Sequence, residues 1–336
     1  MSSSSGHESV GDRRAVAVEL NAAIVAVTDE SPRVLVVDSA ATGGQAALPF
    51  GPFDAAGDRT MELGLRRWVS EQTRLELGYV EQLYTFGDQF RHPQEIVGGP
   101  RIVSVGYLAL TRQTAQPSGV PSHWSAWYEY FPWEDRREGE PGAIGAQILP
   151  RLRAWIARGP DAGLRRLRKE RVDLAFGLAS SGWNDESVLE RYELLYEAGF
   201  VYEAGRDRRS AACDPAAPAQ AGGTPMALDH RRILATAIGR VRGKIKYRPL
   251  VFELLPPAFT LLQFQLAVEA LAGRRLHKGN FRRLVEASGL VEPTGRSRRP
   301  ARGRPAEEFR FRHDVLRERS LPGVRLGGTR GGRLSS

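Results

Sequence analysis

A group of polar and aromatic side chains in one predicted helix has the types and spacing to bear on metal or phosphate chemistry. The helix is expected from about Thr60 to Leu75, and its segment 67–73 reads Arg-Trp-Val-Ser-Glu-Gln-Thr. At about 100° per residue, positions 68, 71 and 72 fall near ~300°, ~240° and ~340° relative to Leu65, so they share one arc. Mg²⁺ requires hard oxygen ligands in near-octahedral geometry, and this arc holds an indole, one carboxylate and one amide. We therefore expect no metal-assisted hydrolysis here.

This segment, with the loop Leu48-Pro-Phe-Gly-Pro-Phe before it, resembles a Nudix box, the loop and helix that cleave nucleoside diphosphates linked to another moiety. Intact boxes read Arg-Glu-hydrophobic-x-Glu-Glu. Here Trp68 stands where the first Glu belongs, Glu71 keeps the second, and Gln72 replaces the third. The Gly pair has become Phe50-Gly51, the spacing to the helix is longer, and Arg74 occupies the usual Gly. The resemblance implies a Nudix-like domain that lacks two of three catalytic carboxylates and is not an enzyme.

A plainer alternative is an amphipathic helix with a buried stripe of apolar side chains, namely Met61, Leu65, Trp68 and Val69. The segments after the helix favour the Nudix interpretation. Residues 84–91 read Tyr-Thr-Phe-Gly-Asp-Gln-Phe-Arg, and the strand-like run 101–110 follows. This region resembles the one after the box in Nudix-related transcriptional regulators of NAD metabolism, the NrtR-like group.

A second group of residues is basic and lies near the carboxyl end. Between Arg274 and Arg319 the chain has 14 Lys and Arg against six acidic residues, which accounts for nearly all of its net charge of +9. Concentrated positive charge on an ordered domain indicates a polyanionic partner. A solvated or disordered basic tail is the plainer alternative.

Two short helices are predicted within and before this basic stretch. The first runs from an N-cap at Thr260 to Gly273, with an apolar stripe at Leu261, Phe264, Val268 and Leu271. The second begins near His277 and is closed by Gly289. Its expected packed side holds Phe281, Leu284, Val285 and Ser288, and its other side is cationic. This pattern is typical of a helix-turn-helix.

Arginines between β-like segments follow over residues 291–312, as a wing requires. Within them, Arg302-Gly-Arg-Pro resembles the core of an AT-hook, which places guanidinium groups in a narrow minor groove. We expect DNA contacts to phosphates and base edges from Lys278, Asn280, Arg282, Arg283, Arg296, Arg298, Arg299, Arg302 and Arg304.

Further segments resemble NrtR-like regulators: 247–260, 280–283 and 303–305 match their carboxy-terminal half, and 229–234 the start of the connecting helix. The resemblance covers roughly 15–135 and 226–312, whereas 140–225 is additional to the shorter members. With Trp68 and Gln72, this addition makes the NadQ-type branch, proteobacterial repressors of de novo NAD synthesis, the most similar. The resemblance implies a homodimer whose Nudix-like halves bind a nucleotide effector and whose winged helices bind a palindromic operator in double-stranded DNA.

We hypothesise that NAD, ADP-ribose or ATP binds between the remnant box and the strands after it, with no cofactor required. The effector must bind one dimer geometry better than the other. Arginines for phosphates and rings for an adenine face make the candidate contacts Arg67, Glu71, Phe86, Arg91 and Trp127. The alternatives to ligand contact are that Arg67 and Glu71 pair with each other and that Trp127 lies in the core. His230 and Cys213 are interpreted as structural or incidental.

The expected fold class is α+β: a Nudix-like α/β/α sandwich with a helical extension, plus a carboxy-terminal winged helix-turn-helix. Strands are expected at 16–27, 34–38, 102–110 and 124–131, and a linker at 207–224. The expected domains are a disordered 1–14, a Nudix-like effector domain 15–160, a helical extension with linker loop and connecting helix 161–250, the winged helix 251–312 and a basic tail 313–336.

Composition narrows the class further. The lone cysteine excludes an intrachain disulfide and favours the cytoplasm. No membrane partner is expected, because no run reaches the ~18 apolar residues of a span. Two alternatives remain open: an active Nudix hydrolase of ADP-ribose or a related dinucleotide, and a nonspecific nucleic-acid-binding accessory protein. A regulator should prefer its palindrome over random duplex by roughly a thousandfold.

Overall fold

The computed structural model describes residues 15–38, 42–87, 92, 95, 97–113, 121–178, 180–207, 219–246, 248–298 and 305–312. The expectations for 1–14 and 313–336 lie outside these residues. Among the helices of the described ranges, none is both long and apolar enough to cross a membrane.

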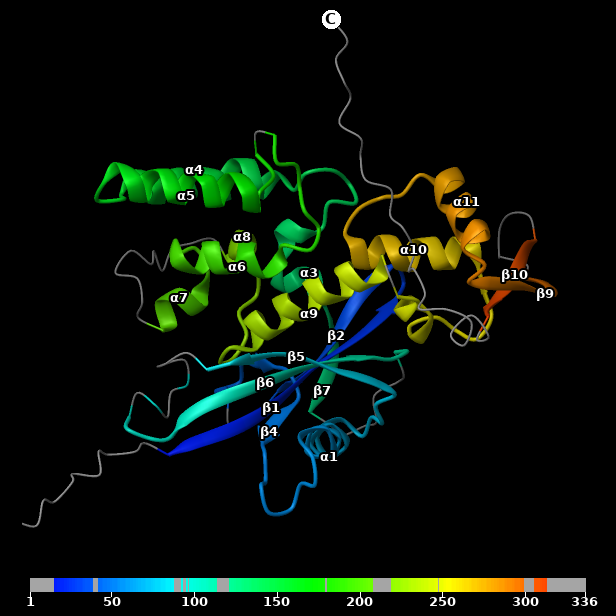
Figure 1. The fold of residues 1–336 in the computed structure, drawn as a ribbon, viewed down its shortest axis with the longest axis horizontal. Coiled ribbons are helices and arrows are strands. Elements are labelled where there is room, and N and C mark those ends of the chain that lie inside the picture. Colours follow the sequence, from blue (N-terminus) through cyan, green and yellow to red (C-terminus); the bar gives the residue numbers. More distant parts are fainter. Residues whose placement is uncertain are drawn as a thin grey trace, which may run out of the picture.

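A mixed seven-stranded sheet is the centre of the amino-terminal half (Figure 1). Its main path is β3-β2-β1-β6-β5, with β4 paired to β1 and β7 paired to β2. β1 and β6 are parallel, and the other pairs are antiparallel. The strands are β1 (Val16–Thr28), β2 (Ser31–Asp38), β3 (Ala46–Ala47), β4 (Phe50–Pro52), β5 (Tyr79–Phe86), β6 (Arg101–Leu110) and β7 (Ser122–Ala126).

The predicted first hairpin is confirmed, and its turn has a clear local cause. Asp29 and Glu30 connect β1 to β2 with φ of 50° and 59°. A two-residue turn with both φ positive matches the right-handed twist of the flanking strands. The strand expected over 124–131 is wrong after Ala126, where the chain turns into α3 (Trp127–Tyr130). That turn buries Trp127 and Tyr130 in the core, so burial outweighs their strand propensity.

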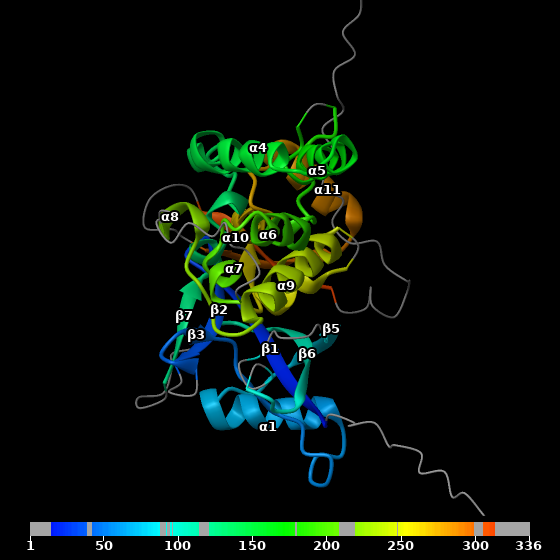
Figure 2. The same ribbon diagram turned by 90° about the vertical axis from the view of Figure 1, so that its left-hand side faces the viewer.

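Helices cover both faces of this sheet, which confirms the α/β/α sandwich. On one face lies α1 (Met61–Thr73), capped by the Thr60 side chain, which accepts from Leu63 N at 3.2 Å. Its Leu65 and Val69 are fully buried against the sheet, whereas Met61 of the predicted stripe is exposed. The opposite face is covered by α9 (His230–Ile245), as Figure 2 shows.

A layer of further helices lies on the outer side of α9 (Figures 1 and 2). α6 packs directly against α9, and α4 with α5 forms the outermost pair. The elements are η3 (Ile144–Ile148), α4 (Leu149–Ala157), α5 (Ala162–Ala175), α6 (Val188–Glu197), α7 (Tyr202–Arg206) and α8 (Ala219–Gly222). We call residues 144–206, which comprise η3 and α4 to α7 but not α8, the helical layer.

The end of the expected linker is packed rather than exposed. Ala221 is buried in α8, and a Cβ at Gly223 would lie 2.3 Å from the Tyr130 carbonyl oxygen. Gly223 also has a φ of +69°, so this close passage requires glycine. The centre of the linker, 208–218, lies outside the described residues.

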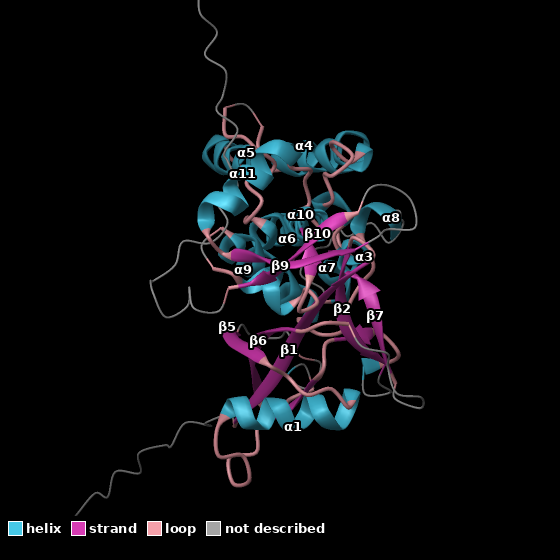
Figure 3. Cartoon of the chain, turned by 90° about the vertical axis from the view of Figure 1, so that its right-hand side faces the viewer, coloured by secondary structure: helices cyan, strands magenta, loops and turns pink. Residues whose placement is uncertain are grey.

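The carboxy-terminal unit, residues 250–311, is a small helix-turn-helix with a wing, and it faces the viewer in Figure 3. Thr260 and Gln263 form a capping box at its first helix, and left-handed glycines, Gly273 and Gly289, end both helices. Phe281 and Val285 are buried as predicted, but Ser288 is exposed. The elements are η4 (Leu250–Glu253), β8 (Phe259–Thr260), α10 (Leu261–Ala272), α11 (Lys278–Ser288), β9 (Val291–Arg298) and β10 (Ala306–Phe311), with strand order β8-β10-β9.

The two halves share one apolar core. A single cluster of buried side chains runs from the α9-covered face of the sheet through α6 and α9 to α10 and α11. α10 also packs directly on β1 and β2. The winged helix is therefore docked on the sheet domain in this structure.

Candidate functional site

Arg67, the first residue of the segment 67–73 that resembles a Nudix box, is held by two acids. It donates to both carboxylate oxygens of Asp58, at 3.1 Å from Nε and 3.0 Å from Nη2. Its Nη1 also lies 3.6 Å from Glu71 Oε1, so the pairing between Arg67 and Glu71 is present. Hydrogen bonding from Arg67 holds the pKa of Asp58 below its usual value. Asp58 was not singled out in the sequence, because it lies in the loop before the helix.

Trp68 and Gln72, which stand where a Nudix box is expected to carry carboxylates, both hold the loop 48–53, here called the box loop. The Trp68 indole donates to the Pro52 carbonyl at 2.8 Å. The Gln72 amide accepts from Phe50 N at 3.0 Å and donates to Phe50 O at 2.6 Å. A Cβ at Gly51 would lie 2.3 Å from the Trp68 ring, so the indole rests on the loop backbone. The side chains at these two positions therefore bind backbone groups of the loop.

Glu71 is the one carboxylate left on this arc. Its side chain is 52% exposed and faces Arg67. Within the described residues, no group of three or more His, Cys, Asp or Glu side chains is arranged to hold a metal ion. In this structure Asp58 and Glu71 together neutralise the Arg67 guanidinium, so a ligand phosphate would have to compete with these two carboxylates.

The structure does not bring the other effector candidates to the box. Phe86 and Trp127 are buried in the core on the α9 side of the sheet, opposite to α1. A Cβ at Gly106 of β6 would touch both Ile233 of α9 and the Phe86 ring, at 3.1 and 3.5 Å, which places Phe86 beneath α9. Arg91 lies outside the described residues.

His230 connects α9 to the loop before the box. Its Nδ1 accepts from Leu48 N at 2.9 Å, and its ring meets the edge of Phe50 with centroids 4.9 Å apart. Because Nδ1 is the acceptor, the neutral ring carries its proton on Nε2. Burial, with Arg206 nearby, lowers the pKa of His230 to about 3.

We expect this histidine to make the protein sensitive to acid. The unfolded histidine titrates near 6.5, so the stability that the neutral form contributes is present above pH 6.5 and is lost as pH falls toward 3. Between pH 7 and pH 5 the expected loss is about 2 kcal/mol. His230→Asn keeps an acceptor for Leu48 N and should remove most of this loss in denaturant titrations.

Glu19 also has a shifted pKa, so its effect on stability has to be separated from that of His230. Burial raises the pKa of Glu19 to about 7, so stability that its protonated form contributes is lost as pH rises from 4.5 to about 7. Glu19 is present in both proteins, so its effect cancels in the difference between wild type and His230→Asn. A difference that stays constant from pH 7 to pH 5 would contradict the assignment to His230.

α11 carries the expected recognition surface. Lys278, Asn280, Arg282 and Arg283 are all exposed on it, while Phe281 and Val285 hold the helix on the core. Arg282 Nε donates to Glu286 Oε1 at 2.8 Å, and Arg283 Nη2 donates to Asn280 Oδ1 at 3.0 Å. These contacts hold the two guanidinium groups along the exposed face. The geometry suits insertion of a helix in a major groove.

The wing adds cations beside this helix. Arg296 and Arg298 are exposed on β9, and Arg298 Nε donates to Glu308 Oε1 of β10 at 2.9 Å. Three more predicted DNA contacts, Arg299, Arg302 and Arg304, lie outside the described residues. The structure describes six of the nine predicted DNA-contacting residues. All six are exposed, and they lie on one helix and one strand of the same unit.

Comparison with known proteins agrees with this geometry. Residues 251–311 match the family model of the NrtR DNA-binding winged helix domain. The ADPR responsive transcriptional repressor NtrR of Acinetobacter baylyi is 40% identical over 86 residues, which are 26% of this chain and 34% of the repressor. The match thus spans about a third of that relative's length.

Two solved structures have a similar fold over nearly the whole chain. NrtR of Shewanella oneidensis, crystallised with a 27mer DNA, superimposes with a TM-score of 0.55 at 20% identity, covering 92% of this chain and 98% of that one. A MutT/nudix family protein from Enterococcus faecalis gives a TM-score of 0.50 at 15% identity, over 91% and 90% of the two chains.

The fold defines a class: a sheet domain with the architecture of those two structures, joined to a winged helix that matches a DNA-binding family. Residues 251–311 are thus similar to the NrtR DNA-binding winged helix, as the sequence motifs predicted, and the fold of the whole chain is similar to that of NrtR from Shewanella oneidensis.

Proposed function

We propose that the protein is a nucleotide-responsive transcription regulator, a repressor of NAD biosynthesis genes. The observation that carries this is the exposed cationic face of α11 within an NrtR-type winged helix. The match of residues 251–311 to a DNA-binding family supports the choice of DNA as partner. We infer that a homodimer binds a palindromic operator in the cytoplasm, one recognition helix to each half-site.

We infer that the Nudix-type domain senses its nucleotide and does not cleave it. The support is the use of Trp68 and Gln72 to hold the box loop, which leaves Glu71 as the one carboxylate of the arc. We propose ADP-ribose as effector, because the Acinetobacter relative is an ADPR responsive repressor; NAD and ATP are the alternatives. Arg67 and Glu71 remain our proposed contacts to the ligand, and Phe86 and Trp127 support the sheet from within the core.

The decisive experiment is selection of bound sequences from random double-stranded DNA, repeated with ADP-ribose, NAD and ATP. The proposal requires recovery of one palindrome, bound roughly a thousandfold more tightly than random duplex. It also requires that one nucleotide changes the affinity for that palindrome. Recovery of no common sequence would favour the nonspecific accessory protein.

Incubation with ADP-ribose and Mg²⁺ or Mn²⁺ should release no AMP above the rate without protein. The physical reason is that a single carboxylate supplies little negative charge to offset the dehydration of a divalent cation. Chromatography of the nucleotides measures the outcome. Turnover that disappears in Glu71→Gln would replace the sensor with the alternative, an active hydrolase.

A further inference from the structure

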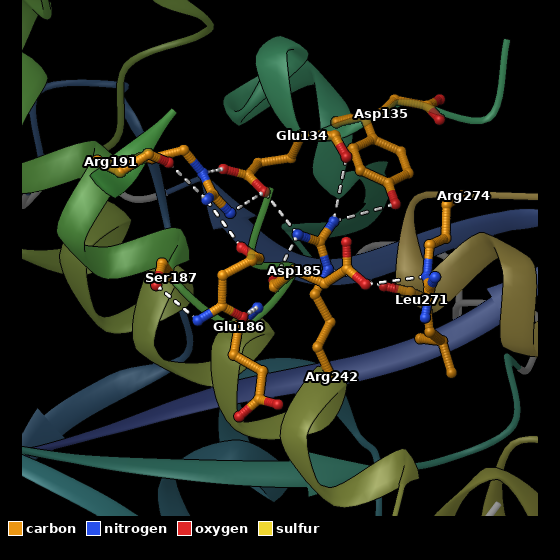
Figure 4. A network of polar contacts seen from close by, with 12 residues as sticks. Glu134, Asp135, Asp185, Glu186, Ser187, Arg191, Arg242, Leu271 and Arg274 are labelled. Carbon is orange, nitrogen blue, oxygen red and sulfur yellow. Dashed lines mark hydrogen bonds and ion pairs between the residues drawn. The ribbon is translucent and has the colours of Figure 1, made fainter. Parts of the chain in front are cut away.

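A cluster of three fully buried charged side chains lies where the two halves of the molecule meet (Figure 4). Glu134 is between Arg191 and Arg242, and none of the three side chains is more than 1% exposed. Arg191 donates to both Glu134 carboxylate oxygens, at 2.5 and 2.9 Å, and Arg242 Nη1 donates to Oε2 at 2.5 Å. We call these three hydrogen-bonded side chains the joint.

Each member comes from a different part of the chain. Glu134 ends η2 (Pro132–Glu134), the segment that leaves the sheet domain. Arg191 belongs to α6 of the helical layer, and Arg242 to α9. The joint therefore ties three separately encoded segments together at one carboxylate.

Arg242 extends this joint to the winged helix. Its Nε donates to the carbonyl of Leu271, in the last turn of α10, at 3.0 Å. Its Nη2 reaches Glu134 O at 3.2 Å and Tyr128 Oη at 3.4 Å. Tyr128 in turn donates its hydroxyl to the Ala270 carbonyl at 2.7 Å. The last carbonyls of α10 thus accept from α9 and from α3.

The residues after α10 are held to the same place. The Gly273 carbonyl accepts from Arg136 N at 2.8 Å, and Arg274 lies 2.9 Å from Asp185 of the helical layer. A Cβ at Gly273 would lie 2.4 Å from Glu134 O, and the φ of Gly273 is +71°, so this approach requires glycine. α11 begins at Lys278, directly beyond this point. Any rotation at the end of α10 therefore moves the recognition helix.

The chemistry of the joint favours one geometry. Burial alone would raise the pKa of Glu134, but the guanidinium groups of Arg191 and Arg242 outweigh it and hold that pKa below its usual value. A buried ion pair adds little net stability over apolar packing, and its best-attested use is to specify one arrangement. A cluster of this kind at a domain junction is suited to orientation.

We propose that Arg242 and Glu134 are positioning residues that orient the winged helix on the sheet domain, with the helical layer as the third support through Arg191. The helical layer then has a function in this chain, because it supports the joint that sets the direction of α11. This part of the inference rests on the proposed function: when the nucleotide binds, the change in the orientation of α11 is transmitted through this joint.

Distance measurement between spin labels tests the positioning role without DNA or nucleotide. The labels are placed at Ser70→Cys on α1 and Ala287→Cys on α11, both exposed positions, in the full chain with Cys213→Ser. Wild type should give one narrow distance distribution, and Arg242→Met a distribution at least twice as broad. The matched control is Arg232→Met: this buried arginine of the same helix pairs with Glu193 and Asp229, and within the described residues neither of its ion-pair partners belongs to the winged helix. It should keep the narrow distribution.

Equal widths in wild type and Arg242→Met, or equal broadening in Arg242→Met and Arg232→Met, would overturn the proposal. If Arg242→Met loses its circular dichroism spectrum, Tyr128→Phe decides instead, because it removes only the hydroxyl bond to Ala270 and a contact with Arg242. Broadening in that variant supports the joint, and an unchanged width rejects it.

A second readout addresses the response. In wild type, ADP-ribose should change the affinity for the selected palindrome by tenfold or more, and in Arg242→Met by less than threefold. If wild type shows no change with ADP-ribose, the proposed effector fails while the distance result for the joint stands on its own.

Discussion

Replacing Lys278, Arg282 and Arg283 together by alanine is expected to lower affinity for the selected palindrome by at least about 100-fold. All three are exposed on one face of α11. A contact to a base edge contributes about 1–3 kcal/mol to the free energy of binding. Each lost phosphate contact also means that fewer counterions are released when the DNA binds. The slope of log affinity against log salt should therefore become shallower by up to about three units. Fluorescence anisotropy over a series of salt concentrations measures both quantities.

The control removes the same charge from another surface. Arg153, Arg166 and Lys169 are exposed in the helical layer, and their replacement by alanine lowers the net charge equally. This variant should bind the palindrome within threefold of wild type and keep the salt slope. Equal losses in the two triple variants would mean that overall charge, and not the recognition helix, drives binding.

Arg231→Met is expected to destabilise the protein by about 3–5 kcal/mol, a large part of the stability of an ordinary domain. The Arg231 side chain is fully buried and lies 3.1 Å from Glu203, which is 2% exposed. It also donates to the carbonyls of Tyr130 and Gly222. Methionine fills a similar volume but leaves the Glu203 carboxylate without its counter-ion in the interior. Urea denaturation followed by tryptophan fluorescence measures the free energy of unfolding.

Two comparisons make this result specific. Arg171→Met removes the partly exposed ion pair with Glu197, at 2.7 Å, and should cost less than about 1 kcal/mol. Adding Glu203→Leu to Arg231→Met removes the stranded carboxylate and should recover part of the loss, as a double-mutant cycle shows. A loss for Arg231→Met no larger than that for Arg171→Met would show that the buried pair is not needed.

Much of the fold was predictable because its signals are local. The cap at Thr60, the capping box at Thr260 and the closing glycines lie within a few residues of the helix ends that they define. The cationic face of α11 was predictable for the same reason, since helical periodicity alone separates Arg282 and Arg283 from Phe281.

The effector candidates were less predictable, because they depend on which face of the sheet a side chain meets. Phe86 and Trp127 have rings suited to an adenine, but both are packed under the helices of the opposite face from Arg67. Strand alternation shows that successive residues face opposite sides, yet it does not show which side a distant helix covers.

By itself, the sequence predicted a Nudix-like domain with a substituted box and determined the winged helix with a basic face that follows it. Only the tertiary structure decided what Trp68 and Gln72 do, and that Arg191, Arg231 and Arg242 are buried. Arginine is almost never fully buried unless paired, and the partner of Arg242 lies 108 positions away. Local patterns carry no information about such a pair, because its energy exists only once the chain has brought both charges out of water together.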